Sequence, residues 1–110
     1  TMSEAYDIHW EGHSGREYGY WILPITDRGR LIRAPGNFIL TKKTKSGIWD
    51  PVYIGQAADL GAEFLDPAAL ECARTRNASH IHVHASEEDP RARQEEVSDL
   101  CRFWAPECNE

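Results

Sequence analysis

What this chain has little of limits the kind of protein it can be. Its 110 residues include only three cysteines, Cys72, Cys101 and Cys108, and no Cys-x-x-Cys pair of the kind that zinc knuckles use. The odd count and wide spacing predict reduced thiols in a cytoplasmic protein. No apolar run approaches the roughly 20 residues of a membrane span, and no basic-then-apolar segment marks a secretory signal. We therefore expect a protein that needs no membrane and no structural zinc.

The composition is that of one ordinary globular domain. Apolar residues make up 41% of the chain and charged residues 27%, a balance that allows a chain of this length to bury a core. Four tryptophans and four tyrosines supply large side chains for that core. There is no internal repeat, low-complexity tract or linker, so residues 1–110 are expected to form a single domain.

Charge is distributed unevenly along the chain, whose formal net charge is −6. The segment 28–45 holds six basic residues and no acidic one, whereas residues 87–110 hold eight acidic and three basic residues. The basic segment is either a solvated surface or a strip that meets phosphate or an acidic partner. The overall negative charge opposes simple attraction to nucleic acid, so tight DNA binding is not expected.

The N-terminal residues 5–25 have the pattern of a β-hairpin. Tyr6, Ile8 and Trp10 alternate with polar residues, as in a strand with one buried face. Residues 12–15 carry turn chemistry, and the same alternation returns in a second strand.

The rest of the domain is expected within residues 36–109. In chain order it comprises strands over 37–41 and 52–56, a helical turn over 59–65, a helix over 66–76, a strand over 79–85 and a last helix over 89–104. Each longer helix begins at an Asp-Pro pair, because Asp accepts hydrogen bonds from free backbone N–H groups and Pro suits the first helical position. The pattern predicts an α+β fold in which helices pack on a small mixed or antiparallel sheet, preceded by the N-terminal β-hairpin.

Two of these strands and the chain's last residues carry a resemblance to a known family. Residues 36–38 read Gly-Asn-Phe, and residues 53–55 read Tyr-Ile-Gly and precede a polar residue. The expected last helix contains Leu100, and Pro106 and Asn109 follow it. Together these features resemble the GIY-YIG nuclease superfamily over roughly two thirds of the chain. The N-terminal hairpin and the last strand also resemble a subgroup of small bacterial proteins of this type.

The resemblance implies a divalent-metal-dependent endonuclease that cuts a DNA phosphodiester. In that family a tyrosine acts as general base, and an arginine stabilises the charge that grows on the phosphate. A glutamate of the last helix holds one metal ion, Mg²⁺ or Mn²⁺.

Most of these catalytic positions are substituted in this chain. Phe38 lacks the hydroxyl of the first motif, whereas Tyr53 keeps the hydroxyl of the second. Glu63 stands at the position of the arginine, Val97 at that of the metal-binding glutamate, and Asn109 is retained. The two retained residues also have ordinary structural interpretations, as a core tyrosine and as an anchor of the C-terminal tail. The resemblance thus implies a degenerate member of the superfamily that has lost catalysis, needs no cofactor and acts as a binding module. The sequence does not identify the partner of this module, and a protein is one candidate.

Glu96 is the alternative metal ligand, one residue from Val97. One residue is about 100° of rotation around a helix. Val97 shares a face with Leu100, Cys101 and Trp104, so we expect Glu96 to point elsewhere. The alternative function is an active or weakly active endonuclease that uses Tyr53, Glu96, Mg²⁺ or Mn²⁺, and a relocated cation.

Three histidines, His80, His82 and His84, alternate along the strand over 79–85 and project to one face. Neighbouring imidazoles on that face are about 7 Å apart, close enough to share a metal if His9 or His13 supplied a third ligand. The other interpretation is a half-exposed sheet face lined by imidazoles, with the two aliphatic residues between them buried on the opposite side.

Overall fold

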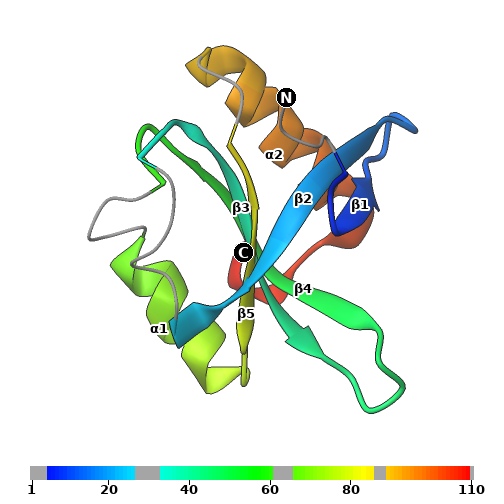
Figure 1. Ribbon diagram of the computed structural model, residues 1–110, viewed down its shortest axis with the longest axis vertical. Coiled ribbons are helices and arrows are strands. Elements are labelled where there is room, and N and C mark those ends of the chain that lie inside the picture. The colour runs from blue at the N-terminus through cyan, green and yellow to red at the C-terminus, as the bar shows by residue number, and fades with distance from the viewer. Residues whose placement is uncertain (1–4, 27–32, 61–65, 86–88, 110) are drawn as a thin grey trace.

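The structure, a computed structural model, describes residues 5–26, 33–60, 66–85 and 89–109 (Figure 1). Its elements are β1 (Ile8–Glu11), β2 (Glu17–Pro24), β3 (Gly36–Lys43), β4 (Trp49–Ala57), α1 (Pro67–Thr75), β5 (His80–His84), α2 (Pro90–Trp104) and the 3₁₀ turn η2 (Glu107–Asn109). Positions 61–65 of the helical turn expected after β4 lie outside these ranges.

A single five-stranded sheet in the order β1-β2-β5-β3-β4 forms the centre of the molecule, and every neighbouring pair is antiparallel. The sheet curls, and α1 and α2 pack on it at different places (Figure 1). The predicted α+β fold is therefore confirmed, and its small sheet is antiparallel throughout the described strands. The N-terminal hairpin belongs to the same sheet, because β2 pairs with β5 from Trp21 to Pro24.

The two helices begin where the Asp-Pro pairs predict. The Asp66 carboxylate accepts hydrogen bonds from the backbone N–H groups of Ala68 and Ala69. Asp89 accepts one from Arg91, also in the first turn of its helix. These bonds satisfy backbone donors that have no partner within the helix, which fixes both starting points.

Each face of the sheet carries its own apolar cluster. Phe38 and Val83 belong to the cluster against which α1 packs, and Ala73 of that helix is a buried member of it. Ile39 and Ile54 belong to the cluster on the α2 side, together with Leu100 of that helix. Because side chains alternate along a strand, adjacent residues of β3 and β4 serve opposite faces.

Cys72 and Cys108 form a disulfide, with their Cα atoms 5.9 Å apart. The expectation of three reduced thiols is therefore wrong for these two residues, and Cys101 alone is a free thiol. The spacing of cysteines along a chain does not reveal that α1 and the C-terminal residues meet in space. The disulfide also removes the cysteine argument for a cytoplasmic location, because such bonds persist mainly in oxidising compartments. None of the described helices is long and apolar enough to cross a membrane.

Candidate functional site

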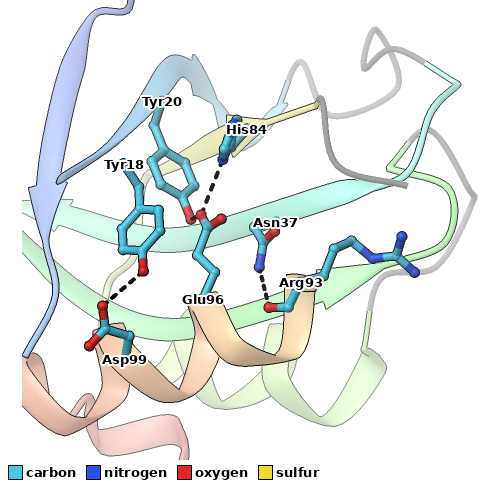
Figure 2. Close-up of polar contacts among 7 residues, drawn as sticks. All are labelled: Tyr18, Tyr20, Asn37, His84, Arg93, Glu96 and Asp99. Carbon is cyan, nitrogen blue, oxygen red and sulfur yellow. Dashed lines mark hydrogen bonds and ion pairs between the residues drawn. The ribbon is translucent and has the colours of Figure 1, made fainter. Parts of the chain in front are cut away.

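A carboxylate is buried between α2 and the sheet. Glu96 is only 6% exposed and accepts a hydrogen bond of 2.5 Å from the Tyr20 hydroxyl. His84 places its Nδ1 atom 3.2 Å from the same carboxylate oxygen. Figure 2 shows the tyrosine of β2 and the histidine of β5 converging on this one side chain of α2. Three elements therefore meet at one acidic group, and β2 is far along the chain from the other two.

Burial, followed by the nearby negative charge of Glu96, raises the pKa of Tyr20 well above its usual range. Tyr20 therefore remains a neutral hydroxyl at physiological pH and donates a hydrogen bond to the carboxylate. His84 adds a charged partner whenever its ring is protonated. The arrangement satisfies a buried carboxylate that would otherwise be costly to remove from water.

An amide and a guanidinium group extend this polar layer along α2. Asn37 of β3 donates its Nδ2 hydrogen to the backbone oxygen of Arg93, at 3.0 Å. Arg93 is itself buried and donates its Nε hydrogen to the Gln56 side chain at 2.8 Å. The Asn37 side-chain oxygen is buried and has no hydrogen-bond partner within the described residues. These contacts make the buried face of α2 largely polar at its N-terminal end.

Asp99, one turn further along α2, holds the β1–β2 hairpin in place. It accepts hydrogen bonds from the Tyr18 hydroxyl at 2.8 Å and from both the backbone and the hydroxyl of Ser14 at 2.8 and 2.7 Å. The Ser14 hydroxyl, countered in part by desolvation, lowers the pKa of the Asp99 carboxyl, with further help from Tyr18. Burial and Asp99 raise the pKa of Tyr18 to about 12. A Cβ atom at Gly12 would lie 2.2 Å from an Asp99 oxygen, so a larger residue there would have to displace the Asp99 carboxylate.

The expectation that Glu96 points away from the sheet is wrong. The most buried residues of α2 are Arg93, Glu96 and Leu100, whereas Val97 is only half-buried beside them. The apolar pattern found Leu100 and the partly buried Val97 but left out Arg93 and Glu96, because it counted no polar residue as core. Tyr20, His84 and Gln56 supply the hydrogen bonds that allow a carboxylate and a guanidinium group to occupy that stripe.

Tyr53, the tyrosine of the Tyr-Ile-Gly stretch, lies on the α1 side of the sheet. Its ring is 5.8 Å from that of Phe38, so these two side chains meet. Its hydroxyl is 3.5 Å from an Asp66 oxygen at the start of α1. Burial, followed by the charge of Asp66, raises the pKa of Tyr53. Glu96 lies on the α2 side, so the structure does not bring Tyr53 and Glu96 together.

Glu63 lies outside the residues that the structure describes. Asn109 lies beside the outer edge of β4. The Asn109 side chain accepts a hydrogen bond from the Ile54 backbone N–H at 2.8 Å and donates one to the Ile54 carbonyl at 2.7 Å. The amide therefore ties the C-terminal residues to the strand that carries Tyr53.

The three strand histidines have separate partners. Trp10 donates its indole N–H to Nδ1 of His82 at 3.0 Å, and Nε2 of His82 is 3.1 Å from the Thr41 hydroxyl. His80 contacts the hydroxyl of Ser79, and His84 contacts Glu96. His82 is fully buried, so the expected half-exposed face is wrong at this position. Its two aliphatic neighbours in β5 do lie buried on the opposite side, as expected.

The residues around Glu96 do not fit a divalent cation. Mg²⁺ keeps several of its waters when proteins bind it, whereas this carboxylate is almost fully buried and already engaged by Tyr20 and His84. In the part of the chain that the structure describes, no three His, Cys, Asp or Glu side chains gather in a way that could hold a metal ion.

Sequence reasoning missed Tyr20, Asn37, Arg93 and Asp99 as members of this polar layer. One signal could have found part of it. Tyr18 and Tyr20 alternate on one strand face, and buried tyrosine hydroxyls require acceptors, which an acidic residue of a covering helix can provide.

Comparison of the chain with protein-family models, with curated proteins and with solved structures yields no match.

Proposed function

We propose that this chain is a degenerate GIY-YIG-like domain that does not cut DNA and acts as an interaction module. The observation that carries the proposal is the separation of Tyr53 from Glu96 by the sheet. A general base and a metal-binding carboxylate must both reach one phosphodiester. A hydroxyl on the α1 side and a carboxylate on the α2 side do not meet that need.

The local chemistry of the retained residues supports the same proposal. A tyrosine that takes a proton from water works best when its pKa is lowered towards the working pH. The pKa of Tyr53 is raised instead, by burial and by Asp66. Phe38, its ring neighbour, offers no second hydroxyl.

The buried carboxylate has a structural role under this proposal. Glu96 joins β2, β5 and α2 through Tyr20 and His84, and no cofactor is needed for that work. Asn109 likewise uses both polar atoms of its side chain to bind backbone groups of β4. A binding role leaves the partner open. A protein suits the acidic chain better than duplex DNA does, because phosphates are repelled by net negative charge.

The test is nicking of supercoiled plasmid by the purified chain in the presence of Mg²⁺ or Mn²⁺. The proposal expects no conversion to open circles beyond that of a mock preparation. A matched sample with chelator identifies contaminating metal-dependent nucleases. Chelator-sensitive nicking that follows the protein through purification and disappears in Tyr53→Phe would overturn the proposal in favour of the endonuclease alternative.

A further inference from the structure

The last residues of the chain form a strap over the outer edge of the sheet. After α2 ends, Ala105 takes a left-handed backbone conformation with φ of 47°, and residues 106–109 turn back to β4. Figure 1 shows these residues, drawn in red, turning back from the end of α2, and Asn109 contacts β4. We call residues 105–109 the C-terminal strap. Its Pro106 is buried, and its Asn109 binds both the N–H and the carbonyl of Ile54.

Asn109 binds β4 as a neighbouring strand would. In an antiparallel pair, one residue of the added strand presents its own N–H and carbonyl to the edge, and the side-chain amide of Asn109 presents the same pair of groups to Ile54. Among the described strands β4 is the last in the sheet order, so none of them pairs with its outward backbone groups. The strap therefore covers an edge that is otherwise suited to accept a strand.

The part of β4 around Ile54, where the strap binds, is also the part best able to pair. Residues 52–57 read Val-Tyr-Ile-Gly-Gln-Ala, which carry no charge and include three residues with a high preference for strands. The other end of β4 carries Asp50 and Pro51, a charge and a residue without an N–H, both of which discourage pairing at an edge.

One covalent bond holds the strap to the body of the domain. The disulfide joins Cys108 of the strap to Cys72 of α1. Both cysteines are partly exposed, so a thiol reductant can reach them. Without the disulfide, the strap keeps the packing of Pro106, the Asn109 pair and an ion pair between Arg76 and Glu107 at 3.0 Å. That ion pair is exposed, and exposed pairs hold segments weakly.

We propose that the strap is a redox-controlled latch, and that its release lets β4 pair antiparallel with β4 of a second copy of this chain. Two equivalents of a thiol reductant become one disulfide, and Cys72 and Cys108 each take up one electron and one proton. A second copy is the occupant because its own released edge is identical and uncharged, so two such edges pair around a two-fold axis without like-charge repulsion between them. The proposal rests on the interaction role proposed above. It names a second copy of the chain as the partner and the Cys72–Cys108 disulfide as the group that controls binding.

Hydrogen exchange at the Ile54 amide tests the latch. In the oxidised protein this N–H donates to Asn109, so it should exchange slowly. Dilute protein, reduced with dithiothreitol and kept monomeric, should exchange it faster by roughly 30-fold, the factor that corresponds to two ordinary hydrogen bonds. The amides of Ile39 and Leu40 in the central strand should not change. The variant Cys108→Ser should behave as the reduced protein without reductant, and Cys101→Ser should behave as the wild type in both states.

Unchanged protection of Ile54 after reduction would overturn the latch. Faster exchange of Ile39 and Leu40 as well would also overturn it, because the disulfide would then support the whole fold and not the strap alone. Asn109→Ala, with the disulfide intact, provides a second route: it should raise exchange at Ile54 even if Cys108→Ser does not fold.

Sedimentation velocity over a range of protein concentrations tests the occupant. The oxidised protein should remain monomeric, and the reduced protein should form dimers as its concentration rises. A reduced protein that stays monomeric at every concentration, with Ile54 unprotected, would overturn pairing with a second copy. The result is independent of the plasmid assay, so failure of the latch leaves the proposed loss of catalysis standing, and nicking activity leaves the exchange result standing.

Discussion

The buried histidine of β5 should make the fold sensitive to acid. His82 accepts a hydrogen bond from Trp10 at Nδ1, which leaves the proton of the neutral ring on Nε2, facing the Thr41 hydroxyl. Protonation would place a second N–H against the indole N–H of Trp10. Burial, followed by repulsion from His80, lowers the pKa of His82 from 6.5 to about 3.

The sign of the effect follows from the lowered pKa. The unfolded chain takes up the proton near pH 6.5, whereas the folded chain resists protonation until about pH 3. The stabilising contribution is therefore fully present above pH 6.5 and is lost as the pH falls through this window. Each pH unit inside the window is worth about 1.4 kcal/mol, so acidification to about pH 4 should cost the fold about 3 kcal/mol. That is a large part of the stability of an ordinary small domain.

Urea unfolding at about pH 7 and about pH 4 measures this loss as a change in the free energy of unfolding. The matched variant is His82→Gln, whose amide can accept from Trp10 and donate to Thr41 but does not titrate. The variant should be less stable near neutral pH, yet its stability should fall by about 3 kcal/mol less than that of the wild type on acidification. Other acidic groups, Asp99 among them, contribute to both proteins alike and cancel in the difference. Equal losses in the two proteins would refute the reasoning.

Three further predictions follow from the same contacts. In the same urea experiment, Asp99→Ala should lower the free energy of unfolding by about 1–3 kcal/mol, because it leaves the Tyr18 hydroxyl without its acceptor. The control Glu95→Ala, on the exposed side of α2, should change the free energy of unfolding by less than about 0.5 kcal/mol. Stoichiometric zinc or nickel should not raise the melting temperature beyond a small effect, since His82 has both ring nitrogens engaged; a rise of several degrees that is lost in His82→Ala would contradict this. Duplex DNA should bind no tighter than micromolar in a mobility shift at physiological salt, and tighter binding would point to the basic segment 28–45.

The features that sequence predicted best depend on neighbours along the chain. Asp66-Pro67 and Asp89-Pro90 place both helix starts because a cap and its donors are separated by only a few residues. The strands follow from alternation, and β3 pairs with β4 because a short polar turn joins them. Such local rules fix the elements and the α+β class.

The features that sequence missed depend on residues that are far apart along the chain. Tyr20 and Glu96 are separated by 76 positions, and no helical period reveals that a carboxylate of α2 will find a hydroxyl of β2. Counting apolar residues therefore assigned Val97 to the buried stripe and directed Glu96 away from it. The disulfide was missed for the same reason, since only the folded chain brings α1 beside the C-terminal strap.

The most direct test of the central claim is the plasmid-nicking rate of the wild type relative to Tyr53→Phe and Glu96→Gln with Mn²⁺. Tyr53 and Glu96 lie on opposite sides of the sheet. The account predicts that all three proteins show the same background rate, unaffected by chelator. Chelator-sensitive nicking by the wild type that both substitutions abolish would contradict it, because the hydroxyl and the carboxylate would then be acting on one phosphodiester.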